Sequence, residues 1–226
     1  MKRMGIEEKI GSVRKRIGAA ASRAGRNPEK IRLVAVTKYA DAAQMIGAID
    51  AGIRIIGENR LQEALEKFEK VPSSKLANVE KHFIGSLQSN KIRAIVKNFD
   101  AIQSLESLSA AKLIDEECRK INRIMPVFAE INIGKEETKH GVLPEEAMEF
   151  CNGLMKFTNI KLAGMMCIAP YSENAENARQ YFRQMRELQK KIGVKWLSMG
   201  MSNDFEVAIE EGSNMVRVGR KIFGEK

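Results

Sequence analysis

Cysteine, histidine and aromatic residues are all scarce in this chain of 226 residues. Its three cysteines stand far apart and form no CxxC pair, which indicates a reducing environment rather than a disulfide framework. His82 and His140 are the two histidines, and neither follows a metal-ligand spacing such as HExxH, so we expect no metal site. Aromatic residues make up 6% of the chain, which leaves few rings to stack on the bases of a single strand.

Long hydrophobic runs are also absent. No apolar run is long enough to cross a bilayer, and the basic N-terminus lacks the continuous apolar segment of a secretory signal. We therefore expect a cytoplasmic protein with no membrane partner. The first 25 residues instead predict an amphipathic helix that carries Ile6, Ile10, Val13 and Ile17 on one face.

The charge balance is basic, with 38 lysines and arginines against 29 acidic residues and a net charge of +9. Such an excess suits nucleic acid, but it equally suits small anions such as phosphates. The basic side chains are scattered, and only the N-terminal helix concentrates them. With so few aromatic residues, a nucleic-acid partner is therefore disfavoured.

Short apolar runs alternate with helical periodicity along the whole chain. The eight expected strands span residues 31–37, 53–58, 81–86, 100–105, 126–133, 161–169, 195–200 and 214–219. Amphipathic stretches between them predict helices over 42–52, 59–71, 88–99, 109–122, 144–157, 176–192 and 203–212. This alternation predicts an α/β fold, a single (β/α)8 TIM barrel with an extra N-terminal helix packed on it, over residues 1–226. A doubly wound sheet is the alternative, but its GxGxxG signature is absent.

Polar residues gather where several expected strands end. Lys38 ends the first strand, Asn59 the second, and the seventh and eighth run into "SMGMSND" and "RVGRKIFG". Phosphate sites in such barrels commonly follow strands seven and eight, at a helix N-terminus. Gly219 lets the backbone approach a ligand closely, and the Ser202 hydroxyl either binds that ligand or serves as a plain helix N-cap.

Lys38 and Arg217 suggest what the ligand is. Arg217 alternates with Val216 and Val218, so it points to the opposite face of its strand, either to solvent or into the barrel. A cation near Lys38 would favour its neutral, nucleophilic amine, which forms a Schiff base with an aldehyde. A phosphate pocket, an arginine and such a lysine together suggest a binding site for pyridoxal 5′-phosphate (PLP). The same three features fit the site of an aldolase that acts on phosphorylated sugars nearly as well.

Several motifs in this order resemble one known family. They are "AVTKYAD", "GENRLQE", "HFIGSLQSNK", "KLAGMMCIAP" and "LSMGMSNDFEVAIEEGSNMVRVGRKIFG". They are typical of the PLP homeostasis proteins, also called the proline-synthase co-transcribed family, which is similar to the N-terminal barrel of alanine racemase. The resemblance implies a single-domain barrel that binds PLP, takes part in PLP homeostasis and has no established turnover.

The same resemblance implies a role for each site residue. Lys38 holds PLP as a Schiff base, Arg217 faces the pyridine nitrogen, and Asn59 lies near the ring face or the 3′-oxygen. The Ser202 hydroxyl holds the phosphate together with backbone N–H groups around Met201, Gly219 and Arg220. The sequence "TKYAD" lacks the proline that many members carry after the lysine, so the role of Tyr39 stays open.

The resemblance also predicts that no residue is catalytic. Alanine racemase uses a second base, a tyrosine from a partner's second domain, and this chain ends at Lys226 after the last barrel motif. Its tyrosines are Tyr39, Tyr171 and Tyr181, of which the first two lie near strand ends. We therefore expect a monomeric PLP carrier, with a fold-type III PLP enzyme such as a weak amino-acid racemase as the alternative.

Overall fold

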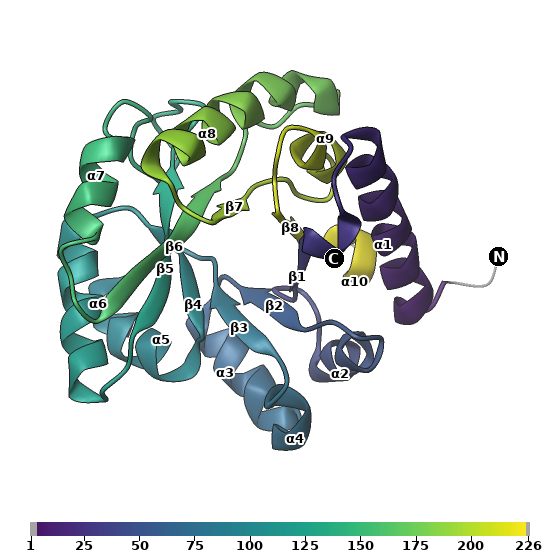
Figure 1. The fold of residues 1–226 in the computed structure, drawn as a ribbon. Coiled ribbons are helices and arrows are strands. Elements are labelled where there is room, and N and C mark those ends of the chain that lie inside the picture. The colour runs from purple at the N-terminus through teal and green to yellow at the C-terminus, as the bar shows by residue number, and fades with distance from the viewer. Residues whose placement is uncertain (1–3, 225–226) are drawn as a thin grey trace.

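Eight parallel strands close into a barrel in the computed structural model, which describes residues 4–224 (Figure 1). Each strand pairs with the next along the chain, and β8 pairs with β1. The strands are β1 (Arg32–Val36), β2 (Ile55–Glu58), β3 (Glu80–Phe83), β4 (Ala101–Leu105), β5 (Met125–Ile131), β6 (Ile160–Cys167), β7 (Trp196–Ser198) and β8 (Met215–Val218). The expected TIM barrel is thus confirmed, and the doubly wound alternative is wrong.

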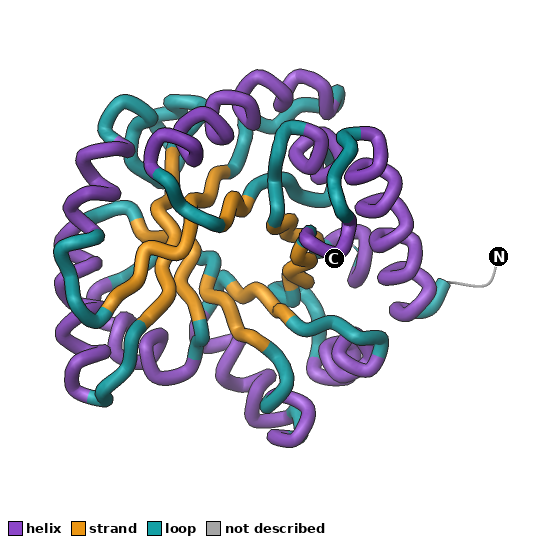
Figure 2. Tube along the Cα trace, in the orientation of Figure 1, coloured by secondary structure: helices purple, strands orange, loops and turns teal. Residues whose placement is uncertain are grey.

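Helices form an outer ring around the strands (Figure 2). They are α1 (Ile6–Arg23), α2 (Ala42–Asp50), α3 (Leu61–Lys70), α4 (Ser73–Leu76), α5 (Ile92–Asn98), α6 (Leu108–Lys120), α7 (Ala147–Leu154), α8 (Arg179–Ile192), α9 (Phe205–Glu210) and α10 (Arg220–Phe223). Short 3-10 turns are η1 (Pro28–Lys30), η2 (Ser89–Lys91) and η3 (Ala175–Ala178). Every predicted helix is present. The four-residue helix α4 was not predicted because one turn carries no periodicity.

Along each strand the side chains alternate in direction. One faces the barrel axis and the next faces the surrounding helices. A packed layer inside the barrel joins side chains of five strands: Val34, Ile55, Phe128, Met166 and Met215. The intervening residues, such as Ala35 and Val218, pack outward in the core beneath the helices. The barrel therefore has a packed interior, in which buried polar side chains such as Ser198 and Gln103 lie beside these apolar ones.

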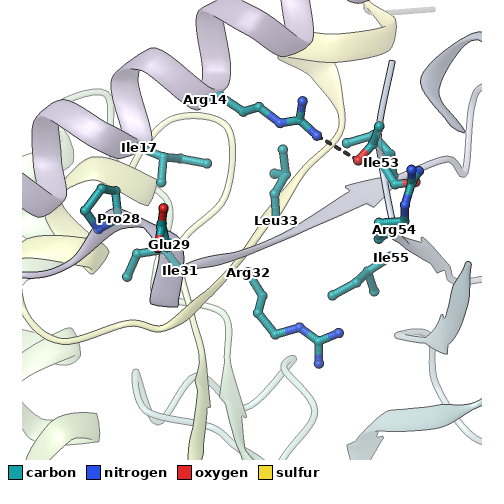
Figure 3. A pocket seen from close by; sticks show the side chains of 11 residues that line it. Arg14, Ile17, Pro28, Glu29, Ile31, Arg32, Leu33, Ile53, Arg54 and Ile55 are labelled. Carbon is teal, nitrogen blue, oxygen red and sulfur yellow. Dashed lines mark hydrogen bonds between the residues drawn. The ribbon is translucent and has the colours of Figure 1, made fainter. Parts of the chain in front are cut away.

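Helix α1 lies against α2, α9 and α10, beside β1 and β8 (Figure 1). Ile10, Val13 and Ile17 are buried as the periodicity predicts, whereas Ile6 is half-buried. At the amino ends of β1 and β2, Arg14 donates to the carbonyl of Gly52 (2.7 Å; Figure 3). It also donates to the carbonyl of Ala51 (3.1 Å). The helix that the sequence predicts over the first 25 residues spans Ile6–Arg23 in the structure. Residues 1–3 of that prediction lie outside the described residues.

Replacing Ile10 by alanine tests how firmly α1 is docked. Ile10 is 1% exposed, so Ile10→Ala leaves a cavity and should lower the free energy of unfolding by about 2–5 kcal/mol in urea titrations. The control Ile124→Ala removes the same atoms from a side chain that is 61% exposed and should change it by less than about 0.5 kcal/mol. Equal, small effects would mean that α1 is not part of the cooperative unit.

Candidate functional site

The segments that the sequence singles out meet along one arc of the barrel rim. Strands β7, β8, β1 and β2 are consecutive neighbours in the closed sheet. The N–H of Arg217 donates to the Gly200 carbonyl (3.0 Å), and the N–H of Thr37 donates to the Gly57 carbonyl (3.0 Å). These bonds hold the carboxyl ends of the four strands together, which is the end where barrel enzymes place their sites.

Arg217 lies inside the barrel and is 4% exposed. Its Nη1 donates to the Ser198 carbonyl (2.7 Å) and hydroxyl (2.8 Å), and its Nη2 donates to the Cys167 carbonyl (2.8 Å). These bonds use three of the five donors of a guanidinium, and residues 4–224 supply no partner for the Nε–H or the second Nη2–H. The solvent-facing alternative for this arginine is therefore wrong.

Burial sets the electrostatics around Arg217. Desolvation lowers the pKa of its guanidinium, and the nearby carboxyls of Glu130 and Asp204 oppose that shift. Neither carboxyl forms a close ion pair with Arg217 within the described part of the chain, where the hydrogen bonds of the guanidinium all go to Ser198 and Cys167. The arginine therefore brings a positive charge, held mainly by carbonyl and hydroxyl oxygens, to the inner side of the arc.

The turn after β7 carries unpaired donors. Helix α9 begins at Phe205 behind Asp204, so Ser202 is not its N-cap, and that alternative is wrong. The Ser202 hydroxyl and the N–H groups of Ser202 and Asn203 have no hydrogen-bond partner among residues 4–224. The N–H of Met201, by contrast, donates to Asp204 Oδ1 (2.6 Å), so this predicted phosphate donor is engaged within the turn.

Gly219 lies between β8 and the short helix α10, which begins at Arg220. A Cβ added to Gly219 would stand 3.0 Å from the Val36 carbonyl oxygen, closer than side chains ordinarily approach a backbone oxygen. Glycine is thus required by the close approach of the β1 and β8 ends. The short helix α10 therefore begins directly beside the carboxyl end of β1.

Lys38 follows β1 by two residues and is half-buried. Its Nζ lies 4.7 Å from the centre of the Tyr39 ring, over a hollow that the β1–α2 turn forms with α3. Lys38 lies beside the segment after β8 and not across the barrel from it, because β1 is the direct neighbour of β8. The structure brings the Lys38 backbone to the arc and directs its amine at Tyr39.

Asn59 directly follows β2 and contributes an unusual group. Its Oδ1 is buried and has no hydrogen-bond partner in the described part of the chain. Leaving a buried acceptor unpaired costs about 1–3 kcal/mol, so such atoms in folded proteins call for an explanation. A ligand with a hydrogen-bond donor would supply one.

A buried ion pair beneath the Lys38 turn was not predicted. Lys67 on α3 pairs with Glu58 at the end of β2 and donates to the Thr37 carbonyl (2.6 Å). The Thr37 hydroxyl donates to Glu58 Oε1 (2.6 Å). Burial raises the pKa of Glu58, and Lys67 and Thr37 oppose the shift. Thr37 and Glu58, which directly precede Lys38 and Asn59, are thus both bonded to Lys67 of helix α3.

Removing the lysine of this pair should be costly. Lys67→Met leaves Glu58 buried without its cation and should lower the free energy of unfolding by about 3–5 kcal/mol, measured in urea at pH 7. The double variant Glu58→Gln, Lys67→Met removes both charges and should recover a large part of that loss. If the changes in the free energy of unfolding caused by the two single substitutions simply add in the double variant, the pair does not act as a unit.

Glu130 is a second residue that sequence reasoning missed. It lies on β5, two residues after the inward-facing Phe128, and is 7% exposed. Burial, with a smaller contribution from Glu106, raises the pKa of its carboxyl to about 7, although Arg217 and His140 oppose the shift. The sequence does hold a signal for this residue. In "PVFAEINI", Glu130 stands two positions after Phe128, so the two side chains point to the same face of the strand.

Because its folded-state pKa is raised, Glu130 favours folding at low pH and opposes it as pH rises through 7. Glu130→Gln should therefore increase the free energy of unfolding by up to about 3 kcal/mol at pH 8 and leave it nearly unchanged at pH 4.5. Urea titrations at both pH values measure this, with the exposed Glu137→Gln as control. A gain of the same size at both pH values would contradict the assignment.

The hollow of Figure 3 lies at the opposite, amino-terminal end of β1 and β2. Its arginines are engaged by the protein, since Arg14 binds the α2–β2 turn and Arg54 donates to the Ile49 and Ile53 carbonyls. Arg32 points away from Arg14 and pairs with Glu80. This hollow therefore serves to dock α1 and lies away from the rim.

Two wider searches of the described residues concern other kinds of site. Within residues 4–224, no group of three or more His, Cys, Asp or Glu side chains is arranged to hold a metal ion. No helix in the same range has the length and apolar character needed to cross a membrane.

Known proteins resemble this chain over nearly its whole length. The family model of the alanine racemase N-terminal domain matches residues 10–226. A protein of Aquifex aeolicus named pyridoxal phosphate homeostasis protein is 40% identical over 225 residues, which cover 97% of each chain. A protein of the same name from Escherichia coli strain K12 is 38% identical over 226 residues, with 98% of this chain and 97% of that one covered.

Solved structures agree with these matches. PipY of Synechococcus elongatus, solved with PLP bound, has a TM-score of 0.83 and 32% identity, covering 97% of this chain and 100% of that one. An uncharacterised protein of Bifidobacterium adolescentis has a TM-score of 0.91 and 34% identity, with 96% and 94% covered. Alanine racemase of Clostridium difficile, at 18% identity and a TM-score of 0.71, shares the fold over 98% of this chain and 57% of its own.

Proposed function

The chain belongs to the family of pyridoxal phosphate homeostasis proteins, and we propose that it binds PLP at the β7–β8–β1–β2 arc of its barrel and serves PLP homeostasis. The observation that carries this proposal is Arg217. Residues 4–224 leave two donors of this buried guanidinium free to bind a ligand, and the pyridine nitrogen of PLP is an acceptor that one of them could reach.

The other groups of the arc fit the remaining parts of PLP. A phosphate accepts hydrogen bonds, and Ser202 and Asn203 hold three donors that have no partner among the described residues. Gly219 lets the start of α10, at Arg220, come close to such an anion. The buried Asn59 Oδ1 lacks a donor, which the 3′-hydroxyl of PLP would provide. We assign Ser202, the N–H groups beside Met201, and those of Gly219 and Arg220 to the phosphate.

We assign the covalent contact to Lys38. PLP supplies an aldehyde, which joins an amine as a Schiff base with release of one water. Lys38 must lose a proton for its Nζ to react, and its side chain must turn from the Tyr39 ring toward the barrel axis. The Glu58–Lys67 cluster holds the backbone before Lys38 and Asn59 in place for this contact.

We propose that the protein does not catalyse a turnover. Its relatives in Aquifex aeolicus and Escherichia coli are named homeostasis proteins. A cationic Arg217 at the pyridine nitrogen disfavours protonation of that nitrogen and so weakens the ring as an electron sink. Tyr39 and Tyr171 are 48% and 76% exposed, and Tyr181 packs on the core beneath α8, which supports the lack of a positioned second base.

One observation favours a second candidate, a weak amino-acid racemase. Glu130 is an acid with a pKa near 7 inside the barrel, close enough to Arg217 for their charges to interact. Such a group could move a proton at a bound amino acid. Following exchange of the Cα hydrogen of alanine in D2O by NMR decides between the two candidates, because a rate that Glu130→Gln abolishes would favour the racemase.

Reduction with borohydride tests the lysine assignment. The purified chain should bind one PLP, and borohydride should fix it as a phosphopyridoxyl group on the tryptic peptide that contains Lys38. Lys38→Ala should lose the fixed group, whereas the control Lys70→Ala, from the same hollow, should keep it. A label on another lysine would contradict the assignment, and an absence of stoichiometric binding would contradict the proposed function.

We further propose that the protein acts as a cytoplasmic monomer. Its cysteines, Cys118, Cys151 and Cys167, are buried and unpaired, and burial raises the pKa of their thiols to about 11, 11 and 12, as suits a reducing compartment. All the residues assigned to PLP come from one chain, which supports a site that needs no partner subunit.

A further inference from the structure

A continuous chain of hydrogen bonds runs through the barrel from Arg217. Arg217 Nη1 contacts Ser198 Oγ (2.8 Å), and Ser198 Oγ contacts Gln103 Oε1 (2.7 Å). Gln103 Nε2 contacts His82 Nδ1 (2.7 Å), and His82 Nε2 contacts Glu80 Oε2 (3.3 Å). The three middle residues are at most 2% exposed. The chain therefore joins the carboxyl rim of the barrel to its amino end through the interior.

Arginine only donates, so Ser198 Oγ accepts from Arg217. With the Gln103 amide placed as in this structure, Ser198 passes its own hydrogen to Gln103 Oε1, and the Gln103 amide nitrogen faces His82 Nδ1 and the Met215 sulfur (3.3 Å). In this arrangement His82 Nδ1 accepts from Gln103, and the ring hydrogen on Nε2 is directed at the Glu80 carboxylate.

The far end of the chain opens on a second hollow, at the amino ends of β3 to β7. His82 lines it, and its side chain is 3% exposed. The hydrogen bond from His82, followed by the hydrogen bond and the charge of Arg32, lowers the pKa of Glu80 to about 2 against the opposing effect of burial, so Glu80 is an anion. The charged groups that face His82 or line this hollow with it are Glu80, Arg32, Asp100, Lys161 and Lys195.

We propose that His82 is a positioning residue for Arg217, and that the proton state of its imidazole reaches the cofactor end of the barrel through Gln103 and Ser198. The proposal rests on the proposed function in one respect, namely that Arg217 contacts PLP. His82 itself touches no part of the arc. Its influence on ligand binding is exerted through the orientation of the guanidinium.

Protonation of His82 would break the chain at a definite place. A hydrogen on Nδ1 would face the hydrogens of Gln103 Nε2, so the Gln103 amide must rotate. Its nitrogen would then donate to Ser198 Oγ beside the bond from Arg217 Nη1, and the Ser198 hydrogen would lose its acceptor and have to turn elsewhere. Arg217 keeps its bonds to the Ser198 and Cys167 carbonyls, so the guanidinium is reoriented rather than released.

The PLP-free chain provides the first test. Long-range ¹⁵N–¹H NMR reads the two imidazole nitrogens, and His140→Gln separates the signals of the two histidines. At pH 8, His82 should carry its hydrogen on Nε2 and none on Nδ1. The Arg217 Nε signal, identified by its loss in Arg217→Lys, should shift between pH 8 and pH 5.5. A hydrogen on Nδ1 at pH 8 would overturn the proposal.

Two variants then separate positioning from a merely structural role. His82→Asn keeps an acceptor at the place of Nδ1 and does not change charge with pH, whereas His82→Leu removes the acceptor. In His82→Asn the Arg217 Nε signal should stay constant between pH 8 and pH 5.5. An equal shift in wild type and His82→Asn would overturn the proposal whether or not the chain binds PLP.

PLP affinity gives the matching functional readout. The ratio of wild-type to His82→Asn affinity cancels the pH dependence of PLP itself and of Lys38. It should be close to one at pH 8 and fall about tenfold at pH 5.5, the effect expected for one hydrogen bond to a charged group. His82→Leu should bind about tenfold more weakly than wild type at pH 8. A constant ratio, with PLP bound by both proteins, would overturn the proposal.

Discussion

A guanidinium inside a barrel must have its donors satisfied, and the interior of this protein is arranged around that requirement at Arg217. Removing such a charge from water is costly unless hydrogen bonds replace the lost solvent. Ser198 and Cys167 provide them from β7 and β6, while Glu130 and Asp204 provide opposite charge at a greater distance. The two donors left over point to a ligand that the fold is built to receive.

The rim also carries backbone, hydroxyl and amide groups that can hydrogen-bond to a ligand. Among residues 4–224, the same arc carries a serine hydroxyl that caps no helix, two N–H groups without a partner and a buried asparagine oxygen without a donor. The buried oxygen costs stability while it has no partner, so a ligand that supplies a donor to it gains affinity from the fold. The Glu58–Lys67 pair has the complementary role, because it fixes the turns that carry Lys38 and Asn59.

The strand pattern and the site differ in how far the sequence could predict them. All eight strands follow from local alternation, which a single strand already displays, and so does the placement of Arg217 on the opposite face from Val216 and Val218. That this face is the inside of the barrel required the structure. Glu130, the Lys67–Glu58 pair and the Arg217–Ser198–Gln103–His82 chain were missed because each depends on side chains from different strands or helices that meet only when the barrel closes. The sequence also gives no rule for a side chain in a turn, so the contact between Lys38 and Tyr39 could not be predicted.

The most direct measurement of the central claim is the ¹⁵N chemical shift of the pyridine nitrogen in ¹⁵N-labelled PLP bound to the protein. Arg217 remains a cation at neutral pH and can only donate, so the nitrogen that faces it must accept. The account predicts an unprotonated nitrogen at pH 7 whose shift moves in Arg217→Gln. A protonated pyridine nitrogen in the wild-type protein, or a shift unaffected by the substitution, would contradict it.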